Sequence, residues 1–130
     1  MSVLNHAEVP FTHLPGLAHQ TLAGPEHGLK TLEVWMQTIA PGSGTPVHRH
    51  ACEEVIVVLR GAGRLTLEGV ERDFGPQSTL HIPPDAVHQI VNTSAEEMHL
   101  VAALGQAPVR VMTPEGERIP LPWQGASSAP

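Results

Sequence analysis

Apolar and polar residues alternate in short runs along most of the chain, and proline and glycine separate the runs. The clearest alternation lies in residues 29–39, which we predict to form a strand. Its two faces carry Leu32, Val34 and Met36 on one side and Glu33, Trp35 and Gln37 on the other. Residues 53–59, EEVIVVL, are apolar and β-branched, so we expect a strand that is buried on both faces.

The remaining chain continues this pattern of short strands. The expected elements are a tight hairpin at residues 61–63 leading into residues 64–69, and strands at 79–82, 88–91, 98–104 and 109–112. Residues 1–28 read as largely irregular, with turns at 15–16 and 24–25. The proline-punctuated tail, residues 113–130, has room for a short helix. Strands every ~8–12 residues predict one all-β sandwich or barrel domain over residues 1–130.

Composition narrows the classes of function. The net charge of −6 and the lack of any Lys/Arg run argue against nucleic acid and anionic membranes as partners. No apolar stretch approaches the roughly 18 residues that a membrane span requires. The first 20 residues lack the basic and apolar regions of a signal peptide, and Cys52 is the single cysteine. We therefore expect a cytoplasmic protein.

Four residues have the pattern of a metal site. His48, His50 and Glu54 are separated by even numbers of residues, so on one extended segment their side chains point to the same face, and His88 follows on a separate strand. Three imidazoles and a carboxylate suit Zn, Mn, Fe, Ni or Cu better than Mg or Ca. The alternative is two surface histidines and a solvated glutamate. A glutamate at the start of an apolar strand, however, needs a partner, because an isolated buried carboxylate is costly.

The other histidines have no such pattern. We expect His6, His13, His19, His27, His81 and His99 to be surface or strand polar residues, with His81 and His99 as candidates for positions behind the metal ligands.

Two motifs around these ligands resemble the cupin superfamily. Residues 42–61 match the first cupin motif, G-x5-HxH-x3,4-E-x6-G, at every fixed position. Residues 77–92 match the second motif at Pro83, His88 and Asn92, whereas Gln77 and Asp85 replace its glycines. The resemblance implies a jelly-roll β-barrel of two packed antiparallel sheets.

Within the cupins, the chain is similar to the plant auxin-binding proteins. The matching residues are 27–30, 33–39, 41–42, 45–55, 58–59, 82–83, 88–89, Asn92, Pro108 and Trp123. This resemblance implies a zinc ion at His48, His50, Glu54 and His88, and a ligand of the indole-3-acetate type whose carboxylate meets the metal. It also implies an apolar pocket at the positions of Leu17, Trp35, Thr45, Pro46 and Trp123, with Gln37 near the carboxylate.

The residues themselves agree in part with this pocket. Trp35 and Trp123 are the only tryptophans and are natural walls for a planar ligand, although plain core packing is an equal alternative. Thr45 and Pro46 otherwise read as turn residues. The tail Leu121-Pro122-Trp123 lacks the second aromatic residue of the plant proteins, so we expect a smaller apolar wall.

Three functions stay open at this point. The first is a metal-dependent binding protein for a small aromatic carboxylate. The second is a metal-dependent dioxygenase or isomerase acting on a small carbonyl or carboxylate substrate, since such a site leaves coordination positions open. The third is a structural barrel with a vestigial site. The family resemblance also implies a homodimer, which would cover the apolar outer face of Leu32, Val34 and Met36.

Overall fold

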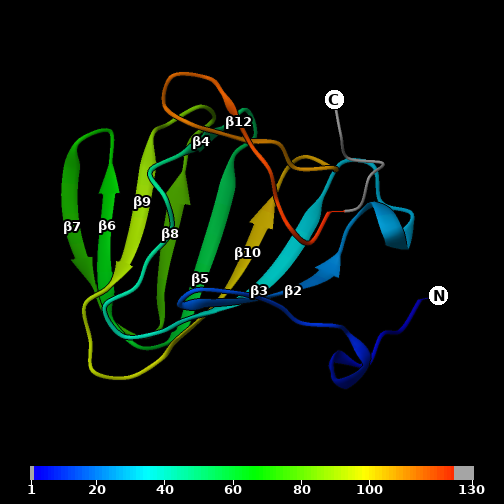
Figure 1. Cartoon of the computed structure of the whole chain (residues 1–130), viewed down its shortest axis with the longest axis horizontal. Coiled ribbons are helices and arrows are strands. Elements are labelled where there is room, and N and C mark those ends of the chain that lie inside the picture. The colour runs from blue at the N-terminus through cyan, green and yellow to red at the C-terminus, as the bar shows by residue number, and fades with distance from the viewer. Residues whose placement is uncertain (1, 125–130) are drawn as a thin grey trace.

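The computed structural model describes residues 2–124, and nearly all of its regular structure is β (Figure 1). The twelve strands are β1 Thr12–Leu14, β2 Leu17–Ala23, β3 Glu33–Ile39, β4 Arg49–His50, β5 Glu54–Arg60, β6 Gly63–Leu67, β7 Val70–Phe74, β8 Ser78–Ile82, β9 His88–Asn92, β10 Met98–Leu104, β11 Val111–Met112 and β12 Arg118–Ile119. Two short 3₁₀ helices, η1 His6–Glu8 and η2 Pro25–His27, complete the regular elements.

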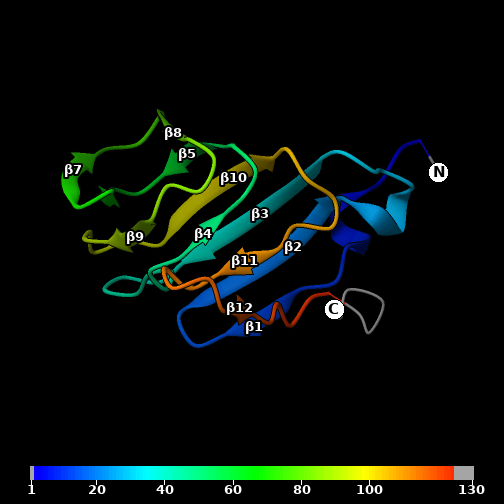
Figure 2. The ribbon, with the colours of Figure 1, turned by 90° about the horizontal axis from the view of Figure 1, so that it is seen from above.

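The strands form three antiparallel sheets. A six-stranded sheet has the order β1-β2-β3-β10-β5-β8, and two three-stranded sheets have the orders β7-β6-β9 and β12-β11-β4. Figure 2 shows the long six-stranded sheet from above, with β2, β3, β10 and β5 side by side. The buried apolar core draws on all three sheets, for example through Ile56, Leu65 and Val111. This arrangement confirms the predicted all-β jelly-roll barrel.

Side chains of the six-stranded sheet alternate between the barrel interior and the outside. In β3, Glu33, Trp35, Gln37 and Ile39 are buried, whereas the residues between them are partly exposed, as the alternation predicted. The expectation for β5 was wrong, because this strand is buried on one face only. Val55, Val57 and Leu59 point outward and are 40%, 38% and 49% exposed. Within residues 2–124 no second layer covers this outer face of β5, and an apolar sequence alone does not reveal the exposure.

The predicted hairpin at residues 61–63 is also wrong. Strand β5 pairs with β10 and β8, whereas β6 pairs with β7 and β9, so residues 61–62 carry the chain from one sheet to the other. Gly61 has φ +85°, and a Cβ atom there would lie 2.8 Å from the Cα of Met98. The hairpin instead lies between β6 and β7, where Glu68 and Gly69 have φ of 49° and 78°.

The N-terminal segment contains more regular structure than predicted, and the described part of the C-terminal segment lacks the short helix for which the sequence left room. Residues 1–28 include β1 and β2, whose connecting turn is the predicted one at residues 15–16, where Gly16 has φ +75°. Residues 113–124 contain the short strand β12 and no helix, and residues 125–130 lie outside the described part. None of the helices within residues 2–124 has the length and apolar character to cross a membrane.

Candidate metal centre and ligand cavity

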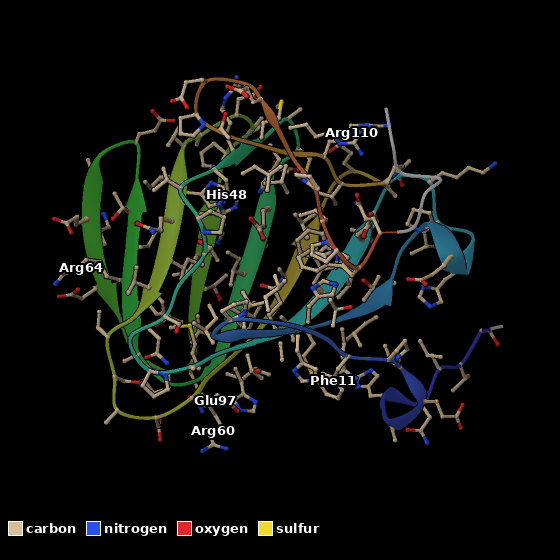
Figure 3. The ribbon with its side chains drawn as sticks, viewed as in Figure 1. Phe11, His48, Arg60, Arg64, Glu97 and Arg110 are labelled. Atoms are coloured by element: carbon tan, nitrogen blue, oxygen red, sulfur yellow. The ribbon has the colours of Figure 1, made fainter. Side chains whose placement is uncertain are left out.

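The four predicted metal ligands meet at one place in the barrel, although they come from different segments. His50 ends β4, Glu54 begins β5 and His88 begins β9, while His48 lies just before β4. Backbone hydrogen bonds hold two of these segments together. The amide of His48 donates to the carbonyl oxygen of His88 over 3.0 Å, and the amide of His88 donates to that of His48 over 2.8 Å. Figure 3 shows His48 among the strands, whereas Arg64 and Arg110 extend away from the barrel.

Each imidazole is oriented by a carbonyl oxygen close to it in the sequence. The Nδ1 atoms of His48, His50 and His88 lie 2.6, 2.8 and 2.8 Å from the carbonyl oxygens of Pro46, Cys52 and Ala86, respectively. A carbonyl oxygen only accepts, so each Nδ1 carries the proton and donates it. The Nε2 atom of each ring is therefore the one available to a metal ion, as is usual for histidine ligands with a fixed tautomer.

The carboxylate of Glu54 joins the imidazoles. Its Oε1 atom lies 3.0 Å from Nε2 of His50 and 3.4 Å from Nε2 of His88. The ligand atoms of the three histidines all lie within 4.8 Å of one another. His50, Glu54 and His88 are buried, and His48 is partly exposed. Such convergence of nitrogen and oxygen donors is the geometry that a single divalent cation bridges.

The electrostatics of the metal-free site reflect this crowding. Burial raises the pKa of Glu54, but the hydrogen bonds from His50 and His88 outweigh it and lower that pKa to about 2. For His50, burial lowers the pKa, whereas hydrogen bonds with Cys52 and Glu54 raise it to about 10. Burial and the neighbouring His88 lower the pKa of His48 to about 4. These shifts describe an ion pair in which Nε2 of His50 shares a proton with Oε1 of Glu54 over 3.0 Å.

The donor set fits a transition-metal ion. Three neutral imidazole nitrogens and one carboxylate oxygen suit Zn, Mn, Fe, Ni or Cu, whereas Mg and Ca prefer sites made of oxygen atoms. Such an ion would remove the shared proton, because the Nε2 atom must be free to coordinate it. The four residues named from the sequence are therefore sterically and chemically suited to hold one divalent ion.

An apolar cavity of about 130 Å³ adjoins these ligands. Its walls include His48, Glu54 and His88 together with many apolar side chains. All six residues expected from the family resemblance line this one cavity: Leu17, Trp35, Gln37, Thr45, Pro46 and Trp123. The cavity walls also include Leu121. The structure thus brings the predicted metal ligands and the predicted pocket residues into one site.

The tryptophan rings of this cavity are fixed by their neighbours. The indole nitrogen of Trp35 donates to Oε1 of the buried Glu33 over 2.8 Å, and the other carboxylate oxygen of Glu33 accepts from the amide of Val109 over 2.8 Å. Trp123 meets Trp35 edge-on, with ring centroids 5.3 Å apart. Within residues 2–124, the indole nitrogen of Trp123 is the one buried side-chain polar atom without a hydrogen-bond partner.

Sequence reasoning missed His19, which it treated as an ordinary strand or surface residue. His19 is only 1% exposed, and its ring stacks on Trp123 with centroids 3.6 Å apart and an angle of 11° between the rings. Its Nδ1 atom lies 3.0 Å from the amide nitrogen of Gln37. One signal could have identified it, because His19 follows Leu17 by two residues on one strand and so shares its side of the sheet.

Two other histidines were candidates for positions behind the metal ligands, and the structure excludes both. His81 is exposed on the outer face of β8, between the buried Leu80 and Ile82. His99 pairs with Glu97 on the surface, over 3.0 Å. Both side chains therefore point away from the metal ligands. Cys52 is buried and forms no disulfide.

Comparison with known proteins identifies the family. The sequence profile described as "Auxin binding protein" matches residues 3–123. The chain belongs to the auxin-binding protein family. Auxin-binding protein T85 of Nicotiana tabacum is 44% identical over 123 residues, covering 84% of this chain and 66% of that protein. Auxin-binding protein 1 of Arabidopsis thaliana is 43% identical over 107 residues, covering 75% of this chain and 54% of that protein. This family member thus spans between about half and two thirds of those relatives.

Solved structures that share the barrel fold of this family member include a cupin and a polyketide cyclase. An RmlC-like cupin from Shewanella frigidimarina superposes with a TM-score of 0.73 at 18% identity, covering 83% of this chain and 93% of that one. The polyketide cyclase RemF from Streptomyces resistomycificus superposes with a TM-score of 0.72 at 20% identity, covering 95% of this chain and 88% of that one. At these identities the likeness shows the barrel fold alone.

Proposed function

We propose that this protein binds a small aromatic carboxylate of the indole-3-acetate type through a divalent metal ion held by His48, His50, Glu54 and His88. One observation carries the proposal. Three of the four proposed metal ligands, His48, Glu54 and His88, line the same apolar cavity as Trp35 and Trp123. A ligand with a negatively charged end and a flat apolar end matches both parts of such a site.

The two parts of the cavity would contribute different terms to binding. The metal ion supplies positive charge for the carboxylate, and the apolar walls remove the ring from water at about 25 cal/mol per Å². Gln37 offers a polar amide on the same wall as Trp35, since both side chains point inward from β3. Zinc is the ion we propose, because the donor set suits it and it captures a ligand without redox chemistry.

Binding is favoured over catalysis by the composition of the cavity wall. Among the described lining residues, the only carboxyl and imidazole groups are those of the metal ligands Glu54, His48 and His88. A dioxygenase or isomerase would gain from a further acid or base placed to move protons on its substrate. The wall offers only the neutral polar side chains of Gln37 and Thr45 in addition.

Calorimetric titration tests the proposal directly. Zinc-loaded protein titrated with indole-3-acetate should release heat and saturate at one ligand per chain, and its tryptophan fluorescence should be quenched, because both tryptophans line the cavity. Indole-3-acetamide, which lacks the charge, should bind more weakly. The variant His50→Ala, loaded in the same way, is the control for the metal. Absence of heat and of quenching at millimolar indole-3-acetate would overturn the proposal.

We also propose that two copies of the chain form a homodimer through the outer face of the six-stranded sheet. That face carries Val55, Val57 and Leu59, which are between 38% and 49% exposed in one chain. Contiguous apolar side chains on a sheet are costly in water, and pairing two such faces would bury them. A cytoplasmic location remains our prediction from the sequence.

A further inference from the structure

His19 and Gln37 face each other across two neighbouring strands. They are directly paired in the register of β2 and β3, and both side chains are buried in the barrel. The amide nitrogen of Gln37 lies 3.0 Å from Nδ1 of His19, and Nε2 of His19 lies 2.7 Å from Oγ1 of Thr21. These contacts form a continuous chain from Thr21 through His19 to Gln37.

The direction of these hydrogen bonds follows from the chemistry of the groups. The amide nitrogen of Gln37 only donates, so Nδ1 of His19 accepts. Burial lowers the pKa of His19 to about 3, and the ring is therefore neutral near pH 7. A neutral ring with an accepting Nδ1 carries its proton on Nε2, which donates to Thr21 Oγ1. This arrangement uses one N–H of Gln37 and leaves its second N–H and its carbonyl oxygen free of His19.

His19 also contacts a second residue of the cavity wall, Trp123. Its ring lies nearly parallel to the indole of Trp123, with centroids 3.6 Å apart, although His19 itself is not part of the cavity wall. Trp123 and Gln37 are both lining residues. One buried imidazole therefore contacts an apolar wall through its face and a polar lining residue through its edge.

We infer that His19 is a positioning residue of the proposed ligand site, which fixes the amide of Gln37 toward the ligand's carboxylate and supports the ring of Trp123. The inference rests on the proposed function. The Nδ1 atom of the imidazole orients Gln37, and the face of the ring supports Trp123. The two parts can be removed separately.

Two substitutions separate these contributions. His19→Phe keeps a ring against Trp123 and removes the acceptor for Gln37, whereas His19→Asn keeps an acceptor near the Nδ1 position and removes the ring. Two ligands report on them, indole-3-acetate and 3-methylindole, which lacks the carboxylate. We expect His19→Phe to lower the affinity for indole-3-acetate by about tenfold, which corresponds to the loss of one hydrogen bond to a charged group. The affinity for 3-methylindole should not change. His19→Asn should weaken both ligands by the same factor.

A double-mutant cycle tests whether His19 acts through Gln37. Gln37→Leu should lower the affinity for indole-3-acetate about as much as His19→Phe does. The double variant should lose no more affinity than either single variant. A loss in the double variant equal to the product of the single losses would overturn the inference. It would also be overturned if His19→Phe weakened the two ligands equally, as a merely structural role predicts.

A measurement without ligand distinguishes failure of this inference from failure of the proposed function. In ligand-free zinc-loaded protein, NMR should show one side-chain amide proton of Gln37 exchanging slowly with water. In His19→Phe both protons should exchange rapidly, and in His19→Asn slow exchange should be retained. If neither indole compound binds the parent protein, the proposed function fails, and the exchange rates still decide the position of the amide. Rapid exchange of both protons in the parent protein would overturn the inference.

Discussion

His48 and His88 are joined by a pair of backbone hydrogen bonds, in which each residue donates its amide to the carbonyl oxygen of the other, at 3.0 and 2.8 Å. This pair ties the segment before β4 to the start of β9, so two of the four metal ligands have their main chains fixed to each other. This pairing fixes the main-chain positions from which these two imidazoles project.

Loss of one imidazole should abolish stable metal binding. His50→Ala removes a buried nitrogen donor and leaves Glu54 without its 3.0 Å partner. We expect zinc affinity to fall by about 100-fold or more, since loss of groups behind metal ligands alone costs 10–100-fold. Competition with a chromophoric chelator measures the affinity. His81→Ala, at an exposed histidine on the outer face of β8, is the matched control and should keep the parent affinity.

The buried imidazole of His19 should make stability depend on pH. Burial lowers its pKa from 6.5 in the unfolded chain to about 3 in the folded protein. Between these values the unfolded state takes up a proton that the folded state excludes, so stability falls as the pH decreases from 6.5 toward 3. This term reaches at most about 1.4 kcal/mol per pH unit and is absent above pH 6.5.

Urea unfolding of metal-free protein at pH 5 and pH 7 measures this dependence, with His19→Phe as the reference. The parent protein should lose more stability than His19→Phe between the two pH values. Equal losses in the two proteins would show that His19 is already protonated in the folded state at pH 5.

The buried carboxylate of Glu33 should stabilise the fold through its two hydrogen bonds. Glu33→Gln places an amide N–H group against either the indole nitrogen of Trp35 or the backbone nitrogen of Val109, both of which are donors. We expect a loss of about 2 kcal/mol in the free energy of unfolding, the cost of an unsatisfied buried polar group. Chemical denaturation measures it. Glu97→Gln, which removes an exposed ion pair with His99, should change stability by less than about 1 kcal/mol.

A charge on the outer face of the six-stranded sheet should dissociate the proposed homodimer. Val57 lies on β5 and is 38% exposed, so Val57→Glu adds a carboxylate at the interface without entering the core. Sedimentation equilibrium should show dimer for the parent protein at micromolar concentration and monomer for Val57→Glu. Val70→Glu, at a residue 56% exposed on β7, should remain dimeric. A monomeric parent protein would contradict the dimer proposal itself.

The sequence predicted most of what depends on local pattern. Alternation identified the inward face of β3 with Trp35 and Gln37, and the cupin motifs brought together His48, His50, Glu54 and His88. The two motif glycines replaced by Gln77 and Asp85 keep their backbone role, because both residues have positive φ, 60° and 59°. A non-glycine residue enters this region at a cost of about 1–2 kcal/mol, and aspartate is among the residues that tolerate it best, so both turns keep the conformation that the motif glycines would favour.

The sequence failed where the outcome depends on the pairing of distant segments. Apolar β5 was expected to be covered on both faces, but only the position of other layers decides whether Val57 is covered. Gly61 looked like a hairpin turn, yet β5 and β6 belong to different sheets. His19 was overlooked because its importance comes from Gln37 and Trp123, which lie far from it in the sequence.

The carbonyl oxygens of Pro46, Cys52 and Ala86 each orient an imidazole only two residues away. Ring orientation is thus encoded within two short stretches, residues 46–54 and 86–88, and owes little to the remaining sequence. A designer who grafted these stretches onto another antiparallel barrel, with the same main-chain pairing between them, would transfer a ready-made cation receptor. The residues that line the surrounding cavity could then be substituted to bind a different ligand.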